Sequence, residues 1–206
     1  MKLNRFMWLG GISGSGKTTI SNKIAEEHDI LVYHTDDYFN YSDVSELKQP
    51  YMWNVQNYGW NSIMKGEPEH DANCLIQHSK EVCEIVISEI SKLNETKQIL
   101  VEGVCLFPQI LNNYGINNIA FITQTVGMYE LLLKNNIAFM ENVIQKADNP
   151  ETKYKAVIKT YTTVLAYIEN QIMDYNCPVF QITRENDRIE CLHFVKKCFL
   201  KSLDQL

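Results

Sequence analysis

The sequence predicts an α/β fold in which a parallel β-sheet is covered by helices on both faces. Short apolar runs alternate with longer segments of helical periodicity, and this alternation is typical of β-α-β units. The first apolar run leads directly into a glycine-rich loop and then a helical segment. No internal repeat, low-complexity segment or interdomain linker divides the 206 residues. We therefore expect a single domain spanning residues 1–206.

Each element follows from a local pattern. Five short apolar runs are the expected strands, at residues 6–9, 30–34, 98–101, 118–122 and 178–182. Helices are expected over residues 17–28 and over residues 72–94. A further helix is expected after an N-cap at Thr125, and another from the start Asp148-Asn149-Pro150-Glu151 through Ile172. The last expected helix follows a cap at Asn186. Residues 38–70 are rich in aromatic side chains without a clear period, so this segment is expected to be irregular.

Composition excludes several function classes. The net charge is −6 and the lysines form no basic block, which argues against a nucleic-acid partner. No apolar run approaches the roughly 20 residues that cross a bilayer, and the first run enters the glycine loop instead of resembling a signal peptide. The six cysteines form no C-x-x-C pair, as expected for buried thiols in a reducing compartment. We expect a cytoplasmic monomer or homodimer that binds neither nucleic acid nor membrane.

Residues 11–18 match the phosphate-binding pattern G-x-x-x-x-G-K-[ST] at every fixed position. Glycines allow successive backbone N–H groups to surround a phosphate, and the following helix adds its positive N-terminal end. The lysine can reach the β- and γ-phosphates, and the threonine hydroxyl can bind Mg²⁺. A purely structural glycine turn is the alternative. The expected nucleotide contacts in this loop are Gly11, Ser13, Gly14, Ser15, Gly16, Lys17, Thr18 and Thr19.

Carboxylates follow the second and third expected strands. Asp36 and Asp37 come directly after one strand, and Glu102 ends the next. Ligands of parallel sheets bind at the carboxyl ends of the strands, so these acids should converge on the glycine loop. Asp36 can orient a hydroxyl and accept its proton, or hold a metal, and Glu102 can coordinate Mg²⁺ together with Thr18. A solvated turn is the alternative for the two aspartates, and a loop-facing side chain before Gly103 is the alternative for Glu102.

These motifs carry a family resemblance. Residues 8–19, the segment Tyr33-His34-Thr35-Asp36-Asp37-Tyr38-Phe39 and residues 100–103 resemble P-loop small-molecule kinases, in particular the uridine kinase and nicotinamide riboside kinase group. Chloramphenicol phosphotransferase and adenylate kinase are more distant relatives by the same residues. Beyond Gly103 the resemblance depends on element order alone. It implies a P-loop kinase-like three-layer sandwich with strand order 2-3-1-4-5, and Lys17 and Asp36 as catalytic residues.

The chain departs from that family in its arginines. Such kinases usually carry arginines in a mobile lid between the fourth and fifth strands, whereas the lid-like region here, about residues 134–153, has none. The cations available there and just beyond it are Lys134, Lys146, Lys153, Lys155 and Lys159. The alternative is that these lysines only lie on a solvated helix face. Arg184 follows the fifth expected strand and is predicted to lie near the adenine.

The aromatic segment 38–70 is expected to form an acceptor-binding insertion, with core packing under a long loop as the alternative. Its candidate acceptor contacts are Asp37, Tyr38, Phe39 and Trp53. No arginine lies between residues 6 and 183, and acids outnumber lysines around the insertion. Because proteins usually grip phosphate with arginine, the expected acceptor is not phosphorylated, as in a nucleoside, a sugar or an antibiotic-like compound.

The sequence thus predicts a kinase that uses ATP and Mg²⁺ to phosphorylate a hydroxyl of a small molecule. The alternative is an ATPase switch or regulator with no small-molecule acceptor. A guanine-specific Asn-Lys-x-Asp motif is absent, since Asn22-Lys23-Ile24-Ala25 lacks the aspartate, and so is an LSGGQ-type transporter signature. Turnover that depends on a second substrate separates the two hypotheses.

Overall fold

The computed structural model describes residues 2–40, 43–94, 97–184 and 187–203. Its strands form one five-stranded sheet in the order β2-β3-β1-β4-β5, with every neighbouring pair parallel. The strands are β1 (Met7–Gly11), β2 (Leu31–His34), β3 (Ile99–Gly103), β4 (Ile119–Gln124) and β5 (Val179–Ile182). The predicted α/β class and strand order are therefore confirmed.

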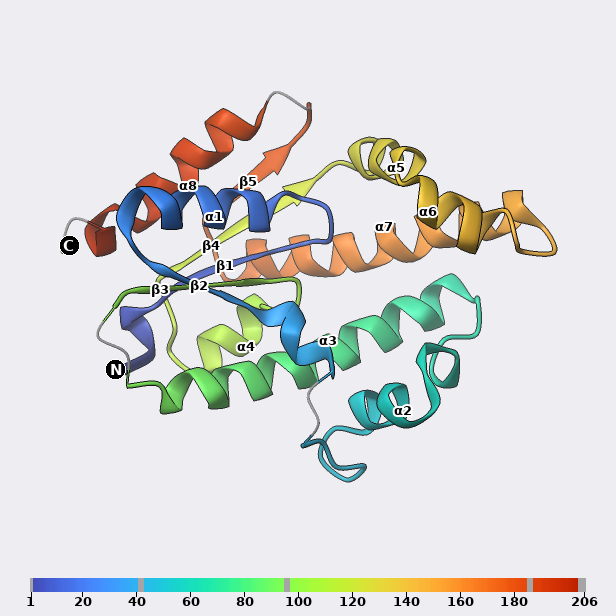
Figure 1. The fold of residues 1–206 in the computed structure, drawn as a ribbon, viewed down its shortest axis with the longest axis horizontal. Helices are drawn as coiled ribbons and strands as arrows, with labels where there is room; N and C mark the ends of the chain where they lie inside the picture. The colour runs from blue at the N-terminus through green and yellow to red at the C-terminus, as the bar shows by residue number, and fades with distance from the viewer. Residues whose placement is uncertain (1, 41–42, 95–96, 185–186, 204–206) are drawn as a thin grey trace.

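Helices cover both faces of this sheet and complete the predicted three-layer sandwich (Figure 1). One face carries α1 (Lys17–His28) and α8 (Arg188–Leu203), and the other carries α3 (Pro68–Lys92), α4 (Pro108–Asn113) and α7 (Pro150–Asp174). The central strand β1 is buried along its whole length. Its side chains alternate between the two faces, so Trp8 packs in the α3–α7 core and Leu9 in the α1–α8 core.

The prediction that residues 38–70 are irregular is wrong in part. This segment contains α2 (Pro50–Tyr58) and two 3₁₀ helices, η2 (Thr35–Asn40) and η3 (Trp60–Ser62). The N-terminus of α2 is stabilised from α3, because the Glu81 carboxylate accepts hydrogen bonds from Tyr51 N at 3.2 Å and Met52 N at 2.8 Å. A cap supplied by a residue so distant in the sequence leaves no local pattern.

Other boundaries also differ from expectation. α3 begins at Pro68, earlier than the predicted residue 72, and α4 was not predicted. Thr125 caps α5 (Val126–Asn135) as predicted, accepting from Met128 N at 3.3 Å. α6 (Ile137–Phe139) and a π-helical turn, η4 (Met140–Ile144), follow. The predicted cap Asn186 lies outside the described residues.

The start of α7 agrees with its predicted signal, because Asn149 Oδ1 accepts from Thr152 N at 3.0 Å and Pro150 opens the helix. In the described part of the chain, no helix has the length and apolar character that a membrane span requires.

Gly11 is the glycine whose lack of a side chain the sheet most requires. Its φ is +143°, and a Cβ atom there would lie 2.0 Å from the carbonyl oxygen of Ile122, its neighbour across β1 and β4. We expect Gly11→Ala to lower the free energy of unfolding by about 3 kcal/mol, since both strain and overpacking act on backbone that cannot move aside.

Denaturant unfolding measures this effect. Gly127→Ala is the control, because a Cβ there meets no atom within 4 Å and the residue lies in α5. That variant should be neutral or slightly more stable. Equal stability of the two variants would contradict the close contact at Gly11.

Candidate active site

The glycine-rich loop connects β1 to α1, as its motif predicts. Gly14 and Gly16 have φ values of 77° and 85°, in the left-handed region that favours glycine. At the end of β4, Gln124 Nε2 donates to the carbonyl oxygen of Ser13 at 3.0 Å and so fixes the loop to the sheet. Ser15 Oγ is buried and has no hydrogen-bond partner among the described residues. Such loops present backbone N–H groups and a helix N-terminus to an anion, and the Ser15 hydroxyl can join them.

Lys17 is buried at the base of this loop. Its Nζ donates to the carbonyl oxygen of Ile12 at 2.8 Å. Burial lowers the pKa of Lys17 to about 8, although the negative charges of Glu102 and Asp36, and more weakly Cys105, oppose the shift. Burial makes the charged form of a lysine less stable, and a bound anion stabilises that charged form again. A buried lysine with a depressed pKa is therefore stabilised strongly when an anion binds beside it. This is the behaviour expected of a lysine that binds phosphate.

Glu102 brings together residues from three elements. The β-sheet register places it beside His34 of β2, and His34 Nδ1 lies 2.6 Å from Glu102 Oε1. The same oxygen accepts a hydrogen bond from Thr18 Oγ1 at 3.0 Å. Two oxygen donors side by side suit Mg²⁺, which takes one or two protein ligands together with phosphates and water. Thr19, the next predicted nucleotide contact, is exposed on α1.

Asp36 lies in η2, directly after β2, and belongs to the same electrostatic cluster. Its pKa is raised, first because packing removes water from its carboxyl and then because Glu102 and Asp37 are negative, while Lys17 opposes the rise. Asp37 follows on the same 3₁₀ turn and is exposed. The structure thus groups Asp36 with the predicted phosphate and metal residues, and a carboxyl with a raised pKa is suited to accept a proton.

Within the described part of the chain, the glycine-rich loop borders a smaller and a larger cavity. The smaller, about 330 Å³, lies at Gly14 and Ser15 and is enclosed by residues of β4, α5, β5 and α8. Its other lining residues are Gln124, Met128, Leu132, Ile182 and Arg188. A cavity of mixed polar and apolar lining with one guanidinium beside a phosphate loop can hold a planar base, because arginine stacks on flat π-systems.

The arginine in this cavity differs from the predicted one. Arg184 points away, with a side chain that is 76% exposed and pairs with Asp187 at 3.2 Å. Asp187 also accepts hydrogen bonds from Thr183 N and Arg184 N, which fixes the loop after β5. Arg188 was not predicted from the sequence as a residue of this site. Its position at the start of the last expected helix, directly after the fifth strand, could have indicated that it lies near the glycine-rich loop. The assignment of Arg184 to the nucleotide stays a prediction.

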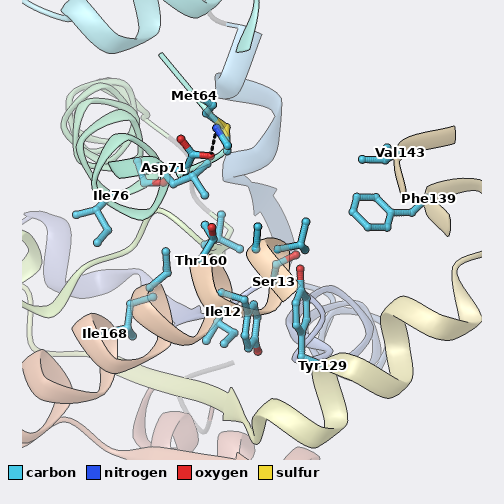
Figure 2. A pocket seen from close by; sticks show the side chains of 18 of the residues that line it. Ile12, Ser13, Met64, Asp71, Ile76, Tyr129, Phe139, Val143, Thr160 and Ile168 are labelled. Atoms are coloured by element: carbon cyan, nitrogen blue, oxygen red, sulfur yellow. Dashed lines mark hydrogen bonds between the residues drawn. The ribbon is translucent and has the colours of Figure 1, made fainter. Parts of the chain in front are cut away.

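The larger cavity, about 410 Å³, lies on the opposite side of the loop, at Ile12 and Ser13 (Figure 2). α3 and α7 form its long walls, and Phe139 and Val143 of the lid-like region close one end. Four consecutive loop residues, 12–15, therefore separate the two cavities. A phosphate chain bound by this loop would place a base in one cavity and its terminal phosphate toward the other.

The predicted acceptor contacts lie elsewhere. Among the described residues that line the larger cavity, Asp37, Tyr38 and Trp53 are absent. Tyr38 stacks on Tyr33 with ring centroids 5.6 Å apart, and Trp53 is half-buried on α2. The Phe39 side chain lies outside the described part of the structure. Their role in acceptor binding stays a prediction that this geometry does not support.

Comparison with solved structures finds chains that resemble this one in fold at low sequence identity. Shikimate kinase from Acinetobacter baumannii, solved with shikimate, superposes with a TM-score of 0.48 at 16% identity, covering 95% of this chain and 92% of that one. Shikimate kinase from Bacteroides thetaiotaomicron superposes with a TM-score of 0.49 at 14% identity, covering 97% of this chain and 98% of that one. A gluconokinase from Sinorhizobium meliloti 1021 superposes with a TM-score of 0.45 at 8% identity, covering 100% of this chain and 97% of that one.

No protein-family model matches the chain, and neither does any curated protein sequence. The likeness to the solved structures describes the fold alone, so the chemistry of the site depends on the residues described above.

The lysines of the lid-like region differ in their surroundings. Lys146 donates to Asn142 at 2.8 Å, Lys155 pairs with Glu151 at 2.5 Å, and Lys159 pairs with Glu69 at 3.3 Å. Lys153 instead lines the larger cavity. Among these lysines, Lys153 is therefore the one that lies at the larger cavity.

Proposed function

We propose that this protein is a kinase that transfers the γ-phosphoryl group of ATP·Mg to a hydroxyl of a small, non-phosphorylated acceptor. One observation carries the proposal: the phosphate loop separates two cavities, while Lys17, Glu102 and Asp36 cluster at its base. A nucleotide-binding switch needs only the smaller cavity, whereas a phosphotransferase needs both. The motif resemblance to the uridine kinase and nicotinamide riboside kinase group supports the same reaction class.

The residues take distinct roles in this proposal. The loop N–H groups and Ser15 Oγ bind the phosphates, and the Lys17 ammonium neutralises charge that develops on the γ-phosphoryl group. Arg188 packs against the base in the smaller cavity. Asp36 orients the acceptor hydroxyl and accepts its proton. The lid-like region, residues 134–153, covers the acceptor.

Thr18 and Glu102 would hold the Mg²⁺, because their hydroxyl and carboxylate oxygens lie 3.0 Å apart beside the loop. Held by these two residues, Mg²⁺ would neutralise negative charge on the phosphates. His34 contacts Glu102 and keeps its carboxylate oriented toward Thr18.

A transfer assay tests the function. The protein is incubated with ATP·Mg and a panel of hydroxyl compounds, and both ADP and phosphorylated product are followed. We expect ADP formation to depend on an acceptor and to match product one to one. Release of inorganic phosphate at the same rate with and without every acceptor would favour the ATPase switch.

The depressed pKa of Lys17 predicts coupling between nucleotide binding and protons. Free protein with a Lys17 pKa of about 8 is mostly deprotonated there at pH 9, and bound phosphates raise that pKa again. ATP·Mg binding should therefore take up nearly one proton at about pH 9 and almost none at pH 7, with affinity falling as the pH rises above 8.

Titration calorimetry at each pH, in two buffers of different ionisation enthalpy, counts the protons. Equal uptake at pH 7 and pH 9 would contradict the assignment of the shift to Lys17.

A further inference from the structure

We propose that the larger cavity binds a neutral, mainly apolar alcohol with a flat ring, and that this alcohol is the phosphoryl acceptor. The inference depends on the proposed kinase function and narrows the acceptor to one chemical class. It excludes phosphorylated and carboxylated acceptors and ranks sugars below aryl or alicyclic alcohols.

The walls of the cavity are mainly hydrocarbon. Leu75 and Ile76 of α3 face Val157, Val164 and Ile168 of α7 across it. An apolar cavity of about 410 Å³ is within the size range of small-molecule sites. Apolar walls of this kind hold water poorly and favour apolar ligands.

One part of the wall is flat. Tyr129 of α5 and Tyr161 of α7 both line the cavity, and their rings stack with centroids 3.4 Å apart and planes 5° from parallel. In this pair each ring covers one face of the other, so a ligand in the cavity meets an outer ring face or the ring edges, and both pack well against another apolar ring. The ring of the acceptor is assigned to this surface.

The charges at the cavity argue against an anionic acceptor. Within the described lining, Asp71 and Lys153 are the charged residues, and they have opposite signs. Asp71 is buried, and its two oxygens accept from Lys65 N at 2.8 Å and Gly66 N at 2.9 Å, so it repels a second anion. A single lysine at the lid end does not form the arginine cluster that phosphate requires.

The hydrocarbon walls also disfavour a sugar. Each ring hydroxyl that enters the cavity gives up water, and the hydroxyl side chains on its long walls in the described part of the chain are Ser79, Thr160 and Tyr161, too few to replace that water for a compound with many hydroxyls. Hydroxyls buried without partners weaken binding. An alcohol with a single hydroxyl avoids that cost if this group lies at the glycine-rich loop.

The reaction can be placed at that end. Asp36 is not among the described lining residues, and it is linked to this end of the cavity through its neighbours: Ile12 lines the cavity and accepts a hydrogen bond from Lys17 through its carbonyl oxygen, and Lys17 interacts electrostatically with Asp36. The acceptor oxygen forms a bond to the γ-phosphorus as the bond from that phosphorus to the β–γ bridging oxygen breaks. ADP leaves with the bonding electron pair, and the hydroxyl proton passes to Asp36.

Binding without nucleotide gives the first test. 2-Naphthylmethanol and 2-naphthoate share one flat ring system and differ in charge, and methyl glucoside represents a sugar. By calorimetry, we expect the neutral alcohol to bind at least about tenfold more tightly than either of the others. Failure of the alcohol to bind, or equal or tighter binding of naphthoate, overturns the proposal.

Two matched variants of α7 locate the binding. Ala156 lines the cavity, whereas Ala166 is exposed on the same helix. Ala156→Leu fills the cavity and should weaken naphthylmethanol binding about tenfold or more, while Ala166→Leu should leave it unchanged. If Ala156→Leu does not fold, Ser79→Leu fills the cavity from α3. Binding unaffected by a folded cavity-filling variant overturns the proposal.

The transfer assay separates this inference from the proposed function. Phosphorylation of naphthylmethanol, reduced in the cavity-filling variant, supports both. Phosphorylation of sugars or nucleosides but not of naphthylmethanol overturns the acceptor class and leaves the kinase function intact. Cavity binding of naphthylmethanol with no acceptor phosphorylated at all overturns the kinase function, and with it the acceptor role of the bound alcohol.

Discussion

Lys17→Ala is expected to weaken ATP·Mg binding about 100-fold, which corresponds to about 3 kcal/mol, the scale of a buried charged hydrogen bond. The variant loses the ammonium proposed to contact the phosphates, and it leaves the carboxylates of Glu102 and Asp36 without the positive charge that interacts with both. Both changes oppose a polyanion, so the loss should exceed that of an ordinary surface charge.

Calorimetric titration with ATP·Mg measures this loss. Lys23→Ala is the matched control, because Lys23 is an exposed lysine of the same helix, and it should bind as the parent does. Denaturant unfolding of both variants verifies that they are folded. Parental affinity in Lys17→Ala would show that the loop does not bind phosphate in the way its motif predicts.

Asp36→Asn is expected to reduce phosphoryl transfer about 100-fold or more, the usual scale for a positioned acid or base. Asparagine has nearly the same shape but cannot accept the hydroxyl proton at this position. ATP·Mg affinity should change little, because Lys17 and the loop amides remain. A large loss of turnover with binding retained is the signature of a residue that acts in the transition state.

Asp37→Asn is the control for this experiment, since Asp37 is the next residue on η2 and is exposed as Asp36 is, but Asp36 and not Asp37 is among the charges that act on Lys17. It should keep most of the parental turnover. If Asp37→Asn were the damaging change and Asp36→Asn were not, the two carboxylates would exchange roles. Parental turnover in both variants would remove η2 from the chemistry.

Much of this fold was predictable because its signals are local. The apolar runs of β1, β3 and β4 are buried on both faces, so they read as continuous hydrophobic segments. The helix start at Asn149-Pro150 and the cap at Thr125 depend on side chains within three residues of the groups they bind. By contrast, α2 is capped by Glu81 from α3, and that contact exists only after α2 and α3 have packed together.

The candidate site likewise has one part that local sequence signals predicted and another part that they did not. The loop motif predicted Lys17 and Thr18, and strand ends predicted Asp36 and Glu102, since the carboxyl ends of parallel strands meet at one edge. The sequence did not indicate the acceptor cavity. An apolar stripe on a helix looks the same whether it packs in a core or faces an open cavity, so Val157 and Ile168 could be predicted to face inward but not to surround a ligand.

The sequence by itself determined the sheet class, the phosphate loop and the acids at its edge, because fixed spacing and strand periodicity encode them within short segments. Only the tertiary structure decided which arginine borders the smaller cavity, which lysine of the lid-like region lines the larger cavity, and where the larger cavity lies. Those features depend on the distance left between packed helices, above all α3 and α7, and that distance is set by side chains far apart in the chain.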